Sequence, residues 1–128
     1  MVEKFWFEKS KEFLEIARNN KESHPWLSCF ASQQSVELAL KGILVKYKGS
    51  YPLTHDLGEL LNLIGKEFSI TILPEILKEC DFLTPHYTQA RYSMITNYNS
   101  RKAENCINSA ERILSWLSSF FKEIKEIL

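Results

Sequence analysis

The polar side chains best suited to chemistry in this sequence are Gln34, Glu37, Lys41, His55 and Arg91. The first three are spaced by three and four residues, so on a helix they project from one side. If the segment around Arg91 folds over that helix, the five side chains form a compact polar cluster. A cluster of this kind in a groove of a helical bundle is a candidate nucleotide or phosphate site. A buried network that satisfies its own hydrogen bonds explains the pattern equally well.

Arg91 has two interpretations at this level. Its planar guanidinium suits a phosphate, which it can bind through two parallel hydrogen bonds. It equally suits a structural salt bridge to Glu37 or Asp56 that would pin the surrounding tyrosine-rich segment against the helix. The sequence leaves both open.

Two histidines could move a proton near neutral pH, which is the range in which imidazole titrates. His55 is the better candidate because it precedes Asp56, which is predicted to cap a helix. Both His55 and His86 also have a structural interpretation, in which the ring bonds a neighbouring helix or a carbonyl group. No His, Cys, Asp or Glu pair shows metal-ligand spacing on one helix face, so we expect neither a metal nor a cofactor.

The overall charge offers no general attraction for nucleic acid. Sixteen Lys and Arg balance sixteen Asp and Glu, which gives a formal net charge of zero. Binding to a phosphate backbone without sequence preference normally needs an excess of cations. Any RNA or nucleotide contact is therefore expected to come from a local cluster.

Cysteine usage and hydropathy predict a soluble cytoplasmic protein. Cys29, Cys80 and Cys106 are odd in number, far apart and surrounded by apolar residues, which predicts buried thiols in a reducing compartment. The N-terminal residues do not resemble a signal peptide, and no apolar stretch is long enough to span a membrane.

Apolar periodicity predicts one all-α domain over residues 1–128, a five-helix up-and-down bundle. The helix ends follow from Gly49 and Pro52, from an Asp56–Glu59 capping box, and from Pro74 as a first-turn proline. The segment 85–100 is expected to be irregular, and an unbroken apolar pattern predicts a last helix from Ala103 to Leu128. The expected helices are 3–19, about 26–48, one opening at Asp56, one from Pro74 to before Pro85, and the last helix.

The same helical spacing predicts which side chains pack together. Glu37 lies near an apolar arc and needs a partner, for which Lys41 is the local candidate. The consecutive Phe5, Trp6 and Phe7 cannot all face one core, so at least one is expected to be exposed at a candidate dimer interface. The expected arc of the second helix comprises Trp26, Cys29, Val36, Leu40, Ile43, Leu44 and Tyr47, and the last helix is expected to bury Ile107, Leu114, Leu117 and Phe121.

The order of several short motifs resembles the HEPN family of prokaryotic helical domains. The resemblance extends over nearly the whole chain, with Trp6 in the first helix and the stretch from Ala103 to Trp116 in the last. Its most specific parts are a glutamine pair, a THDL cap and an ARY segment in this order. The matching residues are Gln33, Gln34, Glu37, Lys41, Tyr51, Pro52, Thr54, His55, Asp56, Leu57, Leu61, Tyr87, Ala90, Arg91 and Tyr92.

The resemblance implies a helical bundle that often forms a homodimer and is often encoded beside a minimal nucleotidyltransferase. The polar cluster and the matching motifs together give the candidate residues for binding a nucleotide or phosphate, with RNA a possible ligand: Gln34, Glu37, Lys41, His55, Asp56, Arg91 and Tyr92. Some members are metal-independent ribonucleases with an Arg, four to six residues, then a His. Counted from Arg91, those positions hold Thr96, Asn97 and Tyr98, so we expect a binding module with little ribonuclease activity. One alternative is a ribonuclease whose base comes from His55 or a dimer mate, and another is a purely structural helical dimer.

Overall fold

The computed structural model describes the backbone of residues 2–92 and 98–128, and within these ranges it contains helices and no strand. The prediction of an all-α bundle is confirmed. The elements are α1 Val2–Asn19, α2 Pro25–Lys48, α3 Leu57–Phe68, α4 Pro74–Leu83, α5 His86–Tyr92, α6 Ser100–Ser118 and the 3₁₀ helix η1 Lys122–Glu126.

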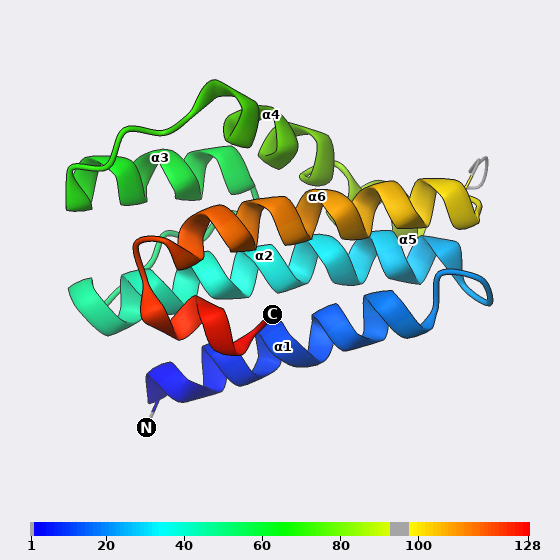
Figure 1. Cartoon of the computed structure of the whole chain (residues 1–128), viewed down its shortest axis with the longest axis horizontal. Coiled ribbons are helices and arrows are strands. Elements are labelled where there is room, and N and C mark those ends of the chain that lie inside the picture. The colour runs from blue at the N-terminus through cyan, green and yellow to red at the C-terminus, as the bar shows by residue number, and fades with distance from the viewer. Residues whose placement is uncertain (1, 93–97) are drawn as a thin grey trace.

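Helix α2 is the central element. It lies between α1 and α6 in Figure 1 and also contacts α3 and α5. The expected arc residues Cys29, Val36, Leu40, Ile43 and Leu44 are buried, whereas Trp26 and Tyr47 near the helix ends are 40% and 45% exposed. Helix α2 ends where Gly49 takes the left-handed conformation with φ of 81°.

The contact between α1 and α2 depends on a small residue. A Cβ atom at Gly42 would lie 2.8 Å from Cβ of Trp6 and 2.9 Å from Cε1 of Phe7. Only a residue without a side chain lets the two backbones approach this closely. Phe7 is buried by this packing while Phe5 remains 54% exposed, which confirms that the three consecutive aromatics do not share one core.

Two sequence expectations for the second half of the chain are wrong. Residues 86–92 form helix α5 rather than an irregular segment; residues 93–97 of that segment lie outside the described part. The last helix ends at Ser118, and the chain continues through Phe121 into η1. The apolar pattern continues past Ser118 because Ile124 in η1 and Ile127 directly after it pack in the same core as α6. Apolar spacing alone therefore does not indicate where α6 ends.

The prediction of three free thiols is also wrong for two cysteines. Cys29 of α2 and Cys106 of α6 form a disulfide, with Cα atoms 5.1 Å apart. All three cysteines are buried as expected, and Cys80 is a free thiol whose pKa is raised to about 12 by burial. The pairing depends on α2 and α6 packing side by side, which the separation of 77 residues in sequence hides.

No described helix has the length and apolar character that crossing a membrane requires.

Candidate functional site

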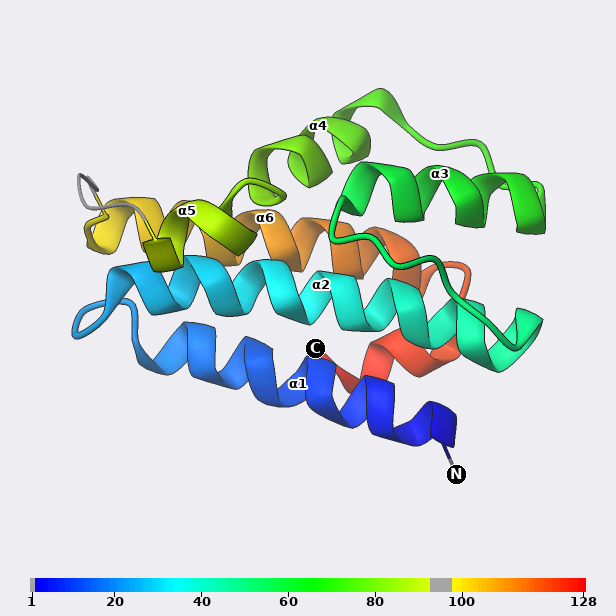
Figure 2. The ribbon, with the colours of Figure 1, turned by 180° about the vertical axis from the view of Figure 1, so that it is seen from behind.

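The connection from α2 to α3 brings His55 to the middle of α2. Figure 2 shows this segment running back along α2 before α3 begins. Asp56 caps α3 by accepting a hydrogen bond at 3.2 Å from the Glu59 amide. The Thr54 hydroxyl accepts from the Asp56 amide at 3.1 Å and donates to Glu59 at 3.0 Å. These bonds fix the turn on which His55 lies. They confirm Asp56 as the N-cap, but Thr54 rather than Glu59 binds the Asp56 amide, so the second half of the predicted capping box is replaced by a bridge through Thr54.

Glu37 is the centre of the polar cluster. Its side chain is only 4% exposed, and Lys41 donates to its Oε2 at 2.9 Å while being 7% exposed itself. Gln33 and Gln34 donate to Oε1 at 2.9 Å and 3.3 Å. The predicted pairing of Glu37 with Lys41 is confirmed, and Lys41 serves as a buried counter-ion.

His55 contacts this buried cluster and extends from it to the protein surface. Its Nδ1 lies 3.1 Å and 3.0 Å from the two carboxylate oxygens of Glu37. A carboxylate only accepts, so Nδ1 carries the proton and Nε2 keeps a lone pair in the neutral ring. The side chain is 50% exposed, and its ring stacks on Tyr87 with centroids 3.7 Å apart. This arrangement holds an imidazole at the surface in one tautomer.

Arg91 approaches the other groups through aromatic rings. Its Nε donates to the Tyr87 carbonyl at 2.8 Å, and its guanidinium carbon lies 4.5 Å from the Tyr87 ring centre. It also lies 4.7 Å and 4.8 Å from the ring centres of Phe30 and Tyr92. No ion pair joins Arg91 to Glu37 or Asp56 in the part of the chain that the structure describes, so the salt-bridge interpretation is wrong.

The structure brings only some of the predicted residues into direct contact. Gln34, Glu37, Lys41 and His55 are in direct contact, whereas Arg91 reaches them through Tyr87. Tyr92 is 68% exposed at the end of α5, and Asp56 serves as the α3 cap.

Three contributors were absent from the candidate set, namely Gln33, Tyr87 and Phe30. Gln33 is fully buried and also donates to the His55 carbonyl at 3.1 Å. A polar residue inside an apolar arc is a signal that it has a buried partner, so Gln33 could have been included. Phe30 could have been found from its position seven residues before Glu37 on the same side of α2.

His86 does not belong to this site. It is buried, and its Nδ1 lies 2.5 Å from the Tyr98 hydroxyl. Burial, and to a lesser extent the charge of Lys102, lowers the pKa of His86 to about 4, so its ring is neutral near pH 7. Of the three positions counted from Arg91, Thr96 and Asn97 lie outside the described residues, and Tyr98 is the partner of His86.

Comparison with known protein families identifies the same family that the sequence motifs resemble. The family model of the HEPN domain matches residues 3–124. The putative toxin MJ1304 of Methanocaldococcus jannaschii is 29% identical, and the match covers 94% of this chain and 88% of that protein.

Two solved structures share the fold. The crystal structure of ST0689, an archaeal HEPN homologue, is 33% identical over 91% of this chain and 95% of its own, with a TM-score of 0.69. The crystal structure of TT1696 from Thermus thermophilus covers 98% of both chains with a TM-score of 0.78. The two sequences are 22% identical, so this similarity shows a shared fold and nothing further.

Proposed function

Because the chain belongs to the HEPN domain family, we propose that it is a HEPN module that binds the phosphate of a nucleotide at the surface formed by His55, Tyr87 and Arg91. One observation carries the proposal: an imidazole in a fixed tautomer and a guanidinium both contact the same tyrosine ring. Their separation cannot exceed the sum of these two short distances. This proximity supports binding of one phosphate, or of two adjacent ones, by the two groups together.

The surroundings favour a nucleotide over other anions. Tyr92 presents an exposed ring beside Arg91, and exposed aromatic rings are the usual stacking partners of bases. The guanidinium of Arg91 provides charge-assisted donors for phosphate oxygens. The formal net charge of zero gives a long nucleic acid backbone little attraction, which favours a mononucleotide, a dinucleotide or a short single strand.

Replacing Arg91 or His55 with alanine is expected to weaken nucleotide binding by about tenfold or more. Arg91→Ala removes a charged donor, and His55→Ala removes the ring that donates to a phosphate oxygen from Nε2 when both of its nitrogens are protonated. Isothermal titration calorimetry or thermal shift with nucleoside mono-, di- and triphosphates measures the effect. His24, at the N-cap of α2, and Arg101, in the first turn of α6, are both exposed. His24→Ala and Arg101→Ala are therefore the controls for losing an exposed imidazole and an exposed guanidinium. Equal nucleotide affinity in Arg91→Ala, His55→Ala and wild type would overturn the proposal.

A second candidate function is metal-independent cleavage of RNA with His55 as the base. The contact between His55 Nδ1 and Glu37 favours it, since a carboxylate on one ring nitrogen leaves the other to take a proton from a 2′-hydroxyl. The similarity to a putative toxin is consistent with this activity. The same variants separate the two functions: RNA cleavage in the presence of a chelator that both His55→Ala and Arg91→Ala abolish, while keeping their stability, would replace binding with catalysis.

We further propose that the module is a homodimer that acts with a minimal nucleotidyltransferase. Phe5, exposed on α1, marks the candidate interface between copies. Light scattering of the wild type is expected to give the mass of a dimer, and Phe5→Ser is expected to shift the equilibrium towards monomer. A wild-type monomer at high protein concentration would contradict the dimer. Copurification with a coexpressed minimal nucleotidyltransferase tests the partner.

A further inference from the structure

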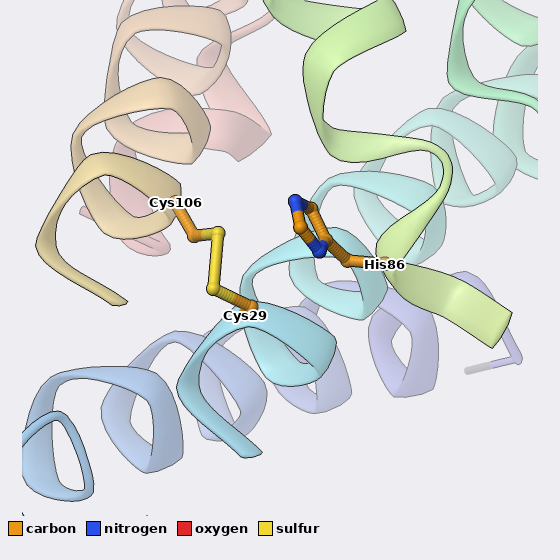
Figure 3. Close-up of side chains that lie close together, drawn as sticks. All are labelled: Cys29, His86 and Cys106. Carbon is orange, nitrogen blue, oxygen red and sulfur yellow. A yellow bond between two sulfur atoms is a disulfide. The ribbon is translucent and has the colours of Figure 1, made fainter. Parts of the chain in front are cut away.

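Three buried side chains from three helices meet on the side of α2 that faces α6. Figure 3 shows Cys29 of α2, Cys106 of α6 and His86 at the start of α5 close together. Their potential ligand atoms all lie within 4.8 Å of one another. The exposed fractions are 0% for both cysteines and 4% for the histidine. None of the three belongs to the His55 site.

The histidine is oriented by a further residue. The Tyr98 hydroxyl lies 2.5 Å from Nδ1 of His86, so that nitrogen is engaged and Nε2 is the atom left for a ligand. Metal-binding histidines typically have their second nitrogen held in this way, which fixes both the tautomer and the ring orientation.

We propose that in the reduced protein Cys29, Cys106 and His86 bind a thiophilic divalent cation, zinc being the expected ion. Two thiolates and one imidazole are ligands that zinc prefers and that magnesium and calcium do not. Two thiolate charges cancel the charge of the ion, and the neutral ring adds none. The loaded site is therefore neutral, which lowers the cost of burying it. Three protein ligands leave one tetrahedral position for water.

The disulfide and the metal site are alternative states of the same cysteine pair. A dithiol reductant supplies two electrons and two protons, the sulfur–sulfur bond breaks, and the reductant leaves as its own disulfide. Binding of the divalent ion then displaces the two thiol protons into solvent. Each state links α2 to α6, and only the metal state also links them to α5.

Cobalt and zinc titrations of the reduced protein in the absence of oxygen test the proposal. Reduced wild type is expected to bind one cobalt ion per chain, with thiolate charge-transfer bands and the visible bands of tetrahedral cobalt, and zinc is expected to displace it. The disulfide form is expected to bind none. Cys29→Ser and Cys106→Ser should lose the charge-transfer bands or leave them about half as intense, and His86→Gln should weaken binding by at least about tenfold.

Cys80→Ser is the matched control, because Cys80 is a buried cysteine outside the cluster, and it should bind cobalt as the wild type does. Circular dichroism follows the fold of each variant. If reduction unfolds the chain, refolding on addition of zinc supports the site, and failure to refold counts against it. Reduced folded protein that shows no thiolate band, or a band that persists unchanged in Cys29→Ser and Cys106→Ser, would overturn the proposal.

Discussion

Replacing Glu37 with alanine is expected to lower the free energy of unfolding by about 3 to 5 kcal/mol. The change leaves the ammonium group of Lys41 buried without its counter-ion, 2.9 Å from where the carboxylate was. It also removes the acceptor of Gln33 and His55. Unpaired buried polar groups carry their full desolvation cost, so the loss exceeds that of an ordinary truncation. Urea denaturation followed by circular dichroism measures the difference.

The double variant Glu37→Leu/Lys41→Met tests this cause. It removes both buried charges and replaces them with apolar side chains of similar size. We therefore expect it to recover much of the stability that Glu37→Ala loses. Glu111→Ala is the control for an exposed pair, because Arg18 and Glu111 are 38% and 36% exposed, and it should cost at most about 1 kcal/mol. A loss below about 1 kcal/mol in Glu37→Ala would mean that the buried pair contributes no more than a surface pair.

The buried network and the candidate site are different parts of one arrangement. Gln33, Glu37 and Lys41 have partners inside the protein, which is the structural interpretation of the polar stripe on α2. His55 is bound to the same carboxylate and still has half of its side chain exposed. The buried part of the network therefore orients a residue that can act at the surface. Loss of stability in Glu37→Ala and loss of nucleotide binding in His55→Ala test these two roles separately, and both can be observed in one protein.

Local patterns predicted most of the fold. The Asp56 cap and the Glu37–Lys41 pair depend on residues three or four positions apart, so helical spacing alone reveals them. The sequence did not predict helix α5, because only His86 and Ala90 of its seven residues are buried and the segment has no apolar stripe. Pro85, which we interpreted as the end of a helix, directly precedes the first residue of α5 and suits the start of one.

Contacts between distant segments could not be predicted in the same way. His55 and Glu37 are 18 residues apart, and their contact exists because the connection to α3 runs back along α2. The Cys29–Cys106 pair depends on the packing of two helices whose register no local pattern encodes. His86 lies beside that pair on a third helix, so spacing along a single helix face does not reveal the three side chains as neighbours.

Replacing Leu114 with alanine is expected to lower the free energy of unfolding by about 2 to 5 kcal/mol, because the change removes buried apolar atoms and leaves a cavity. Leu114 is fully buried on α6 in the main core cluster. Leu53→Ala is the matched control, since Leu53 is 94% exposed and the same truncation there should change stability by no more than about 0.5 kcal/mol. Chemical denaturation of both variants measures the two costs. The apolar spacing of Ile107, Leu114 and Leu117 predicts that this face of α6 packs in the core, and their burial supports it. Equal losses of stability in Leu114→Ala and Leu53→Ala would contradict that packing.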